Sequence, residues 1–263
     1  MLLKVGVDGG GLVIFCGVDR LSIKLRSSPV LARAVPFVIF LALTAFQGQL
    51  GEASRYWFYL AKTVAGAWLI WSVWPVVTEM RWALSWEAAV VGAGVFAMWV
   101  GLDGHYPSLD ELTQKFLCPL LKSIGLASWC PQPATAGLPW NPHLQFAGSA
   151  AMAWFFIGVR LVGSTFVVPP LEEVFYRSFI YRYIIKPDFE SVPLGRFQPL
   201  AFVLTSVVFG FEHGQWLAGI LCGFAFQGLV CWKGRLGDAM TAHALTNLLL
   251  GLWVIWKGAW NFW

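Results

Sequence analysis

The stretch from Leu144 to Ile185 is almost continuously apolar. It is about twice as long as the ~20 residues with which an α-helix crosses the hydrocarbon core of a bilayer. Pro169 and Pro170 interrupt it, and proline fits the first turn of a helix but not its interior. The sequence therefore predicts one membrane span over 144–168 and a second helix that begins at the two prolines.

Composition agrees with a protein of the bilayer. Apolar residues make up 58% of the chain and charged residues 12%, whereas soluble domains are about 25% charged. The 16 tryptophans fit the preference of indole rings for the headgroup interface. The net charge of +4 is small, and no basic run is interleaved with aromatics, so nucleic acid is excluded as a partner.

Further apolar segments raise the expected count to about eight transmembrane helices, which makes the fold class an all-α polytopic membrane protein. These segments are residues 30–50, 56–77, 88–102, 197–211, 216–232 and 239–256. Arg33 and Lys62 lie toward span ends, where long basic side chains are expected to reach back to the headgroups.

The chain divides into a basic N-terminal arm (1–29), N-terminal spans with a long polar loop (30–143), and a C-terminal membrane region (144–257). The basic arm favours a cytoplasmic N-terminus, and an even number of spans would return Lys257 to the same side. Basic residues in 181–196 and 233–235 count against that orientation.

The polar loop, residues 103–143, carries its own signals. Ser108 followed by Glu111 matches a capping box and predicts a surface helix over 109–124. The loop histidines, His105 and His143, are interpreted as solvated side chains. Cys118 and Cys130 share this loop, and a disulfide between them is possible if the loop faces an oxidising compartment, although free cysteines are the favoured interpretation. The cysteines at 222 and 231 are interpreted as small core residues.

Two adjacent glutamates follow the double proline. Glu172 and Glu173 are expected in the first helical turn, where the helix dipole stabilises carboxylates. Arg177 is four residues beyond Glu173 and shares its face, while Glu172 points about 100° away. One acid is thus restrained and the other is free, which is how two carboxylates in one site acquire different roles.

Polar groups recur in two later apolar segments, as Phe209-x-x-x-His213 and His243-x-x-x-Asn247. Ionisable side chains at membrane depth are costly and normally face a protein interior or a wet cavity. A carboxylate deprotonates water, imidazoles bind a metal or carry a proton, and an amide holds an oxyanion. A purely structural pairing of the glutamates with Arg160 or Arg177 is the alternative.

These three motifs, in this order, resemble the signature of the CPBP family of intramembrane proteases, which includes CAAX prenyl endoproteases of the Rce1 type and bacteriocin-immunity relatives. The resemblance covers about residues 144–256. It implies an intramembrane catalytic cavity in which Glu172 activates water with the help of His213. It further implies that His243 and Asn247 stabilise the oxyanion, and that Arg177 anchors Glu173.

The resemblance leaves a metal open. Glu172, His213 and His243 make a sufficient zinc-binding set, and we favour zinc over a water activated by glutamate alone. These ligands come from three separate helices, so their spacing does not identify the metal.

Ser178 and Glu212 depart from the family pattern, and Glu212 is interpreted as an interfacial carboxylate rather than a partner of His213.

The resulting hypothesis is an intramembrane endopeptidase in the inner membrane of a bacterium. Its expected partners are membrane lipid and a membrane-associated protein or peptide substrate, lipidated or unlipidated. The alternatives are a noncatalytic scaffold or bacteriocin-immunity-type protein, and a transporter that uses the buried acids as a relay. A transporter is expected to show matching interruptions in both halves, yet here the polar residues are all C-terminal.

Overall fold

The protein is helical throughout the part described by the computed structural model, residues 20–131 and 139–263, where no strand occurs. The longer helices are α2 (Pro29–Ala45), α3 (Ser54–Val73), α4 (Trp86–Leu102), α8 (Ala150–Val162), α11 (Pro199–Phe211), α12 (Trp216–Lys233) and α13 (Gly237–Lys257). The short ones are α5 (Leu109–Leu112), α6 (Cys118–Ser123), α7 (Pro142–Gln145), α9 (Val168–Glu173) and α10 (Tyr181–Ile185).

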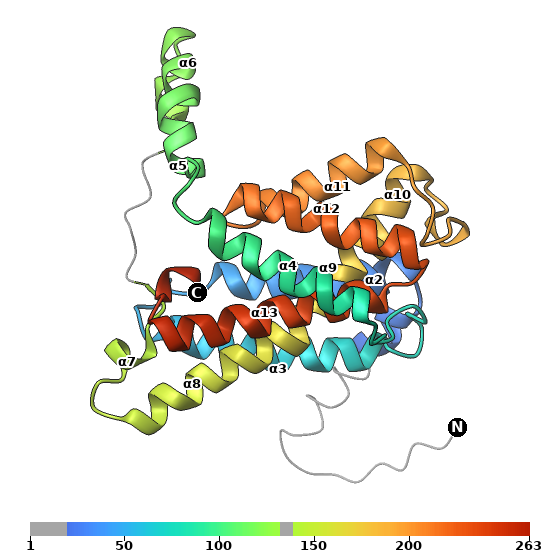
Figure 1. The fold of residues 1–263 in the computed structure, drawn as a ribbon, viewed down its shortest axis with the longest axis horizontal. Helices are drawn as coiled ribbons and strands as arrows, with labels where there is room; N and C mark the ends of the chain where they lie inside the picture. Colours follow the sequence, from blue (N-terminus) through green and yellow to red (C-terminus); the bar gives the residue numbers. More distant parts are fainter. Residues whose placement is uncertain (1–19, 132–138) are drawn as a thin grey trace.

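The long helices lie side by side in one bundle, while α5 and α6 project away from it (Figure 1). Hydrogen bonds and ion pairs identify the two ends of the bundle. At one end, Arg26 donates a hydrogen bond to the carbonyl of Ser72, and Lys233 pairs with Glu87. We call this the basic end, because the following cations gather there: Lys24, Arg26, Arg81, Arg182, Lys186, Arg196, Lys233 and Arg235.

At the opposite end, Gln215 donates a hydrogen bond to Asp103 at 2.7 Å, and Trp140 packs against Trp263. We call this the mouth end. The chain enters α2 at the basic end and leaves α13, with Lys257, at the mouth end (Figure 1). The expectation that Lys257 returns to the side of the N-terminal arm is therefore wrong. The arm itself lies mostly outside the described residues, of which 20–26 are helical.

Three helical segments among the described residues are long and apolar enough to cross a membrane, namely Ala150–Ile185, Trp216–Lys233 and Gly237–Lys257. Shorter apolar helices cover Pro29–Ala45, Trp86–Leu102 and Pro199–Phe211. The chain is thus an all-helical integral membrane protein, as predicted. The expected count of about eight crossings is not reproduced.

The double proline does not split the long apolar stretch, contrary to prediction. Helix continues from Ala150 to Ile185, with π-helical turns at Gly163–Val167 and Val174–Ile180. Proline removes a backbone donor and crowds the carbonyl four residues earlier. The wider π-helical turn immediately before Pro169 relieves that conflict. Glu172 and Glu173 therefore lie in mid-helix, so the stabilisation expected from a helix N-terminus does not apply.

Glycines let α11 and α12 approach closely. A Cβ built on Gly223 would lie 2.9 Å from the backbone of Ser206, and one on Gly219 would lie 2.9 Å from Gly210. Small residues are what allow helix backbones to touch in membranes, where lipid provides no hydrophobic drive for association. This contact fixes the end of α11, from which His213 projects.

The polar loop follows the prediction in outline. The capping box between Ser108 and Glu111 is present, and the helix it starts runs through α5, a π-helical turn at Thr113–Leu117, and α6. Cys118 and Cys130 form a disulfide, with Cα atoms 5.1 Å apart. Cys222 is buried, as expected for a core residue.

The basic side chains placed toward span ends do not reach for the headgroups. Arg33 is buried and pairs with Glu79 at 2.7 Å and with Glu190 at 3.1 Å. Lys62 is 6% exposed and points inward. The prediction of snorkelling was wrong for both, because acidic or aromatic partners inside the protein were invisible in the local sequence.

Candidate active site

The two adjacent glutamates have different surroundings, as their helical spacing predicted. Glu173 is fully buried and pairs with Arg177 at 3.2 Å. Glu172 is 7% exposed and faces a cavity. Its Oε2 atom has no hydrogen-bond partner among the described residues. Arg177 is held in turn by the face of the Phe209 ring, 4.2 Å from the guanidinium carbon.

His243 joins both acids. Its Nδ1 lies 2.9 Å from Glu173 Oε1, and its Nε2 lies 3.9 Å from Glu172 Oε2. A carboxylate only accepts hydrogen bonds, so Nδ1 carries a proton, and in the neutral imidazole the lone pair of Nε2 then faces Glu172. The ring also stacks on Phe226 at 5.1 Å. Glu173 therefore fixes both the orientation and the tautomer of His243.

Asn247 lies one turn beyond His243 on α13. Its side-chain amide donates a 2.8 Å hydrogen bond to the carbonyl of Ser164, which belongs to the π-helical turn at Gly163–Val167. One amide hydrogen is used in that contact and the second remains. The π-helical turn that admits the prolines thus also supplies the carbonyl that orients Asn247.

His213 follows the last turn of α11. Its Nδ1 lies 2.8 Å from the carbonyl of Phe209, and its ring packs against Trp99 at 5.4 Å. Because the carbonyl accepts, Nε2 again carries the free lone pair. The neighbouring Glu212 is exposed and accepts a 2.6 Å hydrogen bond from Tyr176 rather than from His213.

Four of the six predicted site residues line one cavity of about 650 Å³, namely Glu172, His213, His243 and Asn247. Glu173 and Arg177 lie behind its wall. The cavity reaches the mouth end, where Asp103 and Gln215 belong to its lining. These residues come from two helical segments and a connecting turn, 75 positions apart at most, and they meet because α11 and α13 pack against the 150–185 helix.

The cavity also contains residues that sequence reasoning did not assign to the site. Lys62 and Arg160 line it, together with Tyr59 and Thr44. The sequence does contain this lysine and arginine within apolar segments. We interpreted Lys62 only from its place near the end of a span, and that gave no reason to assign it to the site.

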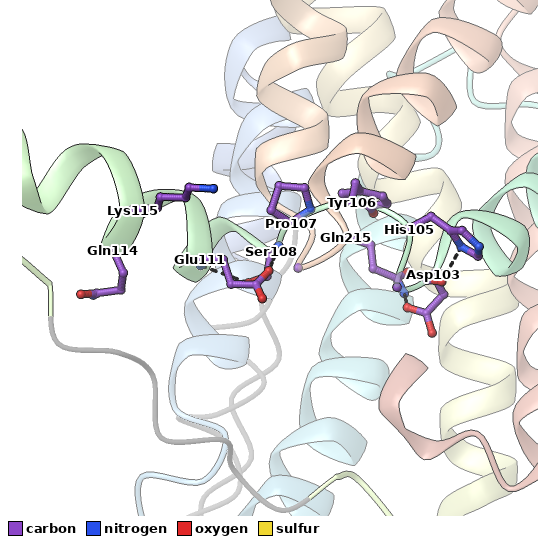
Figure 2. A pocket seen from close by; sticks show the side chains of 11 residues that line it. Asp103, His105, Tyr106, Pro107, Ser108, Glu111, Gln114, Lys115 and Gln215 are labelled. Carbon is purple, nitrogen blue, oxygen red and sulfur yellow. Dashed lines mark hydrogen bonds between the residues drawn. The ribbon is translucent and has the colours of Figure 1, made fainter.

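A second hollow of about 1000 Å³ adjoins the cavity at the mouth end (Figure 2). The two share Asp103, Gly214 and Gln215. His105, which lines this hollow, has its Nδ1 2.9 Å from the backbone carbonyl of Asp103, a hydrogen bond drawn in Figure 2. His143 does not line it and packs between Trp154 and Trp260.

The two histidines of the cavity have the hydrogen bonds of metal ligands, but they are not grouped around one position. Each histidine donates through Nδ1 to an acceptor and leaves Nε2 free, which is the arrangement of metal-binding histidines. Yet no three His, Cys, Asp or Glu side chains in the described part of the chain are grouped closely enough to bind one ion. Glu172, His213 and His243, the predicted set, are therefore not assembled as a metal centre.

Ser178, which departs from the family pattern, belongs to a buried network at the basic end. Its hydroxyl donates to Glu79, which also binds Arg33 at 2.7 Å and Arg182 at 3.1 Å. Burial opposes ionisation of Glu79, but hydrogen bonds and charge from Arg33, with the Ser178 hydrogen bond, lower the pKa of its carboxyl. This network ties the segment before α4 to the helix that carries the glutamates.

Comparison with known proteins supports the resemblance. Residues 153–249 match the model of the family described as type II CAAX prenyl endopeptidase Rce1-like. The chain is also 25% identical over 178 residues to the dipeptide and tripeptide permease A of Enterobacter sp. (strain 638), covering 62% of this chain. It spans about a third of the length of that curated relative. No solved structure matches.

Proposed function

Since residues 153–249 are Rce1-like, we propose that the protein is an intramembrane endopeptidase that hydrolyses peptide bonds of membrane-associated substrates. One observation carries the proposal. Glu172 Oε2, which has no hydrogen-bond partner among the described residues, faces a cavity among apolar helices and lies 3.9 Å from a nitrogen of His243, whose ring is fixed by Glu173. An acid, an oriented imidazole and an amide in one cavity are the parts that amide hydrolysis requires.

In the proposed mechanism, Glu172 and His243 position the water. Glu172 Oε2 and His243 Nε2 are both acceptors and are close enough to share one water molecule, one hydrogen bond each. Glu172 takes a proton as the water oxygen attacks the carbonyl carbon of the substrate. This role for His243 replaces the predicted oxyanion contact, because its free nitrogen carries a lone pair rather than a proton.

Asn247 then stabilises the tetrahedral oxyanion with the amide hydrogen that Ser164 does not use. The proton held by Glu172 passes to the departing amine nitrogen as the C–N bond breaks, which leaves a carboxylic acid and an amine as products. His213, with its free Nε2 at the other side of the cavity, assists this transfer. Each such donor or base contributes on the order of 10²- to 10³-fold in rate.

We propose that the mouth of the cavity faces the non-cytoplasmic side of the membrane. Cytoplasmic segments are enriched in Lys and Arg, and these residues gather at the basic end. The Cys118–Cys130 disulfide follows α4 at the other end, and disulfides persist in oxidising compartments. We propose a multi-pass protein of a bacterial inner membrane that cleaves at the outer face.

The test is cleavage of fluorogenic membrane peptides, lipidated and unlipidated, by the purified protein in detergent. Turnover is expected for the wild type and its loss for Glu172→Gln and His243→Ala, with unchanged circular dichroism and thermal midpoint as controls. Chelator, followed by added zinc, tests the predicted metal, and loss of activity restored by zinc would support it. Equal cleavage by wild type and Glu172→Gln would refute the assigned site.

A transporter is the second candidate, and the similarity to a dipeptide and tripeptide permease favours it. Uptake of labelled tripeptides by proteoliposomes distinguishes the two. Uptake without cleavage would support transport, whereas cleavage that depends on Glu172 with no uptake would support the protease. Absence of both would favour the noncatalytic, immunity-type scaffold.

A further inference from the structure

The helix that begins at the capping box has an uncovered apolar face. Residues 109–123 are continuously helical through α5, the π-helical turn and α6, and Ile124 follows directly. Phe116, Leu120 and Ile124 recur every four residues, so they share one face of this helix. Their side chains are 62%, 58% and 59% exposed. Glu111 and Lys122 fall on the opposite face, so the helix is amphipathic and its apolar side is the exposed one.

The chain returns along the polar side of this helix. Cys118, on the polar face, forms the disulfide with Cys130. Gln114 donates a 2.8 Å hydrogen bond to the carbonyl of Pro131. Helices that pack in water bury their apolar stripes against the protein. Here the return segment is bonded to the polar side and leaves the apolar side free, which indicates an apolar environment outside the protein. We call residues 109–131 the projecting hairpin.

The base of the projecting hairpin is fixed at the level where the membrane helices end. Trp216, the first residue of α12, donates a 2.9 Å hydrogen bond from Nε1 to the carbonyl of Pro107. Its ring stacks at 6.0 Å on Phe211, the last residue of α11. Tryptophan favours the boundary between membrane and water. From this point the hairpin runs crosswise to the long helices and beyond the side of the bundle (Figure 1). Its axis therefore follows the surface of the bilayer.

We propose that the projecting hairpin docks on lipid and lies in the interface of the leaflet at the mouth end, with Phe116, Leu120 and Ile124 among the acyl chains. Amphipathic helices on membranes place Phe, Leu and Trp toward the acyl chains and charged side chains toward water. The bilayer is the occupant because the hydrocarbon layer around the spans ends at the level where Trp216 fixes the hairpin. The hairpin contains two acidic and two basic side chains, so the contact is apolar and does not depend on lipid charge. The inference is independent of the peptidase proposal.

The polar side of the projecting hairpin belongs to the mouth. Glu111, Gln114 and Lys115 line the hollow that adjoins the cavity, with Asp103 and Gln215 on its other side (Figure 2). Lipid on one side and an aqueous hollow on the other match the two faces of the helix. The docked hairpin thereby holds one wall of the mouth at the level of the lipid headgroups.

The test compares two positions on opposite faces of the same helix. Leu120→Cys and Lys122→Cys are made in the full chain with Cys16→Ser and Cys231→Ser, because the other cysteines are buried or bonded. Each protein is labelled with an environment-sensitive fluorophore and placed in phosphatidylcholine nanodiscs, whose two surfaces are both open to solutes. Nitroxides on the acyl chains are expected to quench the label at 120 at least about threefold more than the label at 122, and aqueous iodide should show the reverse order. Ile124→Cys should behave like Leu120→Cys.

Changing the apolar face provides a second readout. With the label at Ile124→Cys, Phe116→Asn is expected to lower quenching by the acyl-chain nitroxides about twofold or more, because an apolar anchor is lost. Lys122→Asn is the matched control on the polar face and should leave that quenching unchanged. Equal effects of the two substitutions would contradict an apolar contact with lipid.

Three outcomes would overturn the proposal. Iodide quenching of the label at 120 as strong as that at 122 would show that the hairpin lies in water. Protection of the label at 120 from both quenchers would assign the apolar face to a protein partner. Nitroxide quenching that appears only when phosphatidylglycerol replaces phosphatidylcholine would assign the contact to headgroup charge.

Discussion

Glu172 and Glu173 are neighbours in sequence that differ in what surrounds their carboxylates. Glu173 lies 3.2 Å from Arg177 and 2.9 Å from His243, whereas Glu172 Oε2 has no hydrogen-bond partner among the described residues and lies 3.9 Å from His243. Removing one partner of a buried, bonded pair leaves the other uncompensated. Removing an unpartnered carboxylate removes a desolvation cost instead. The two residues should therefore respond differently to the same substitution.

We predict that Glu173→Gln lowers both stability and activity, whereas Glu172→Gln abolishes activity and leaves the thermal midpoint unchanged or raised. The loss for Glu173→Gln should be on the order of 3 kcal/mol, because the Arg177 charge loses its partner. Thermal unfolding in detergent measures the first effect and peptide cleavage the second. A Glu172→Gln protein that unfolds as early as Glu173→Gln would contradict the division of roles.

Asn247 is predicted to act on the rate of the chemical step. Asn247→Asp keeps the size of the side chain but replaces its amide donor with an acceptor, so the oxyanion loses its hydrogen bond. We expect kcat to fall about 10²- to 10³-fold, with KM changed little. Steady-state kinetics measure the two constants separately, and a rise in KM at constant kcat would show that Asn247 binds substrate instead.

At the scale of elements, close glycine contacts between α11 and α12 set the position of His213. We predict that Gly223→Ala lowers activity and stability, because the added methyl group meets the backbone of Ser206 at 2.9 Å and forces the helices apart. Gly228→Ala on the same helix is the control, since its methyl group meets only the ring of Phe202 at 4.0 Å. That control should stabilise by about 0.5–1 kcal/mol through helix propensity. Equal effects of the two substitutions would contradict the packing argument.

The network around Glu79 predicts a pH dependence. The pKa of its carboxyl is lowered below the ordinary 4.5 despite burial, by Arg33 and Ser178. A depressed folded pKa adds stability that is fully present above pH 4.5 and is lost as pH falls through the folded value. The thermal midpoint of the wild type should fall below about pH 4.5, and Glu79→Gln should be less stable at pH 7 with a flatter acid profile. Parallel profiles for the two proteins would argue against this linkage.

At the scale of the whole molecule, the distribution of basic residues and the disulfide predict which end faces the cytoplasm. In intact cells, an impermeant maleimide should label Lys122→Cys, near the mouth end, and leave Lys186→Cys, at the basic end, unlabelled until the cells are opened. Both positions are exposed, so accessibility through the membrane decides the result. The reverse pattern would place the cavity mouth in the cytoplasm.

The sequence alone determined the membrane environment and the helical class, and it named the six candidate site residues of the three motifs. These follow from local chemistry: apolar runs need a bilayer, and i, i+4 spacing places Glu173 with Arg177 on one helix face. The same reasoning failed at Pro169 and Pro170, because a π-helical turn absorbs the prolines in a way that residue preferences do not reveal. It failed likewise for Arg33, whose partner Glu79 is 46 positions away in the chain.

Only the tertiary structure decided how the motifs meet. Glu173 is 70 positions from His243, and their contact fixes the tautomer of the histidine and with it the proposed role. The cavity itself depends on α3 packing against the 150–185 helix, which brings Lys62 to the wall of the cavity that Glu172 faces. Sequence specifies which groups are costly to bury, because that cost is local. Which groups compensate one another is set by packing between distant helices.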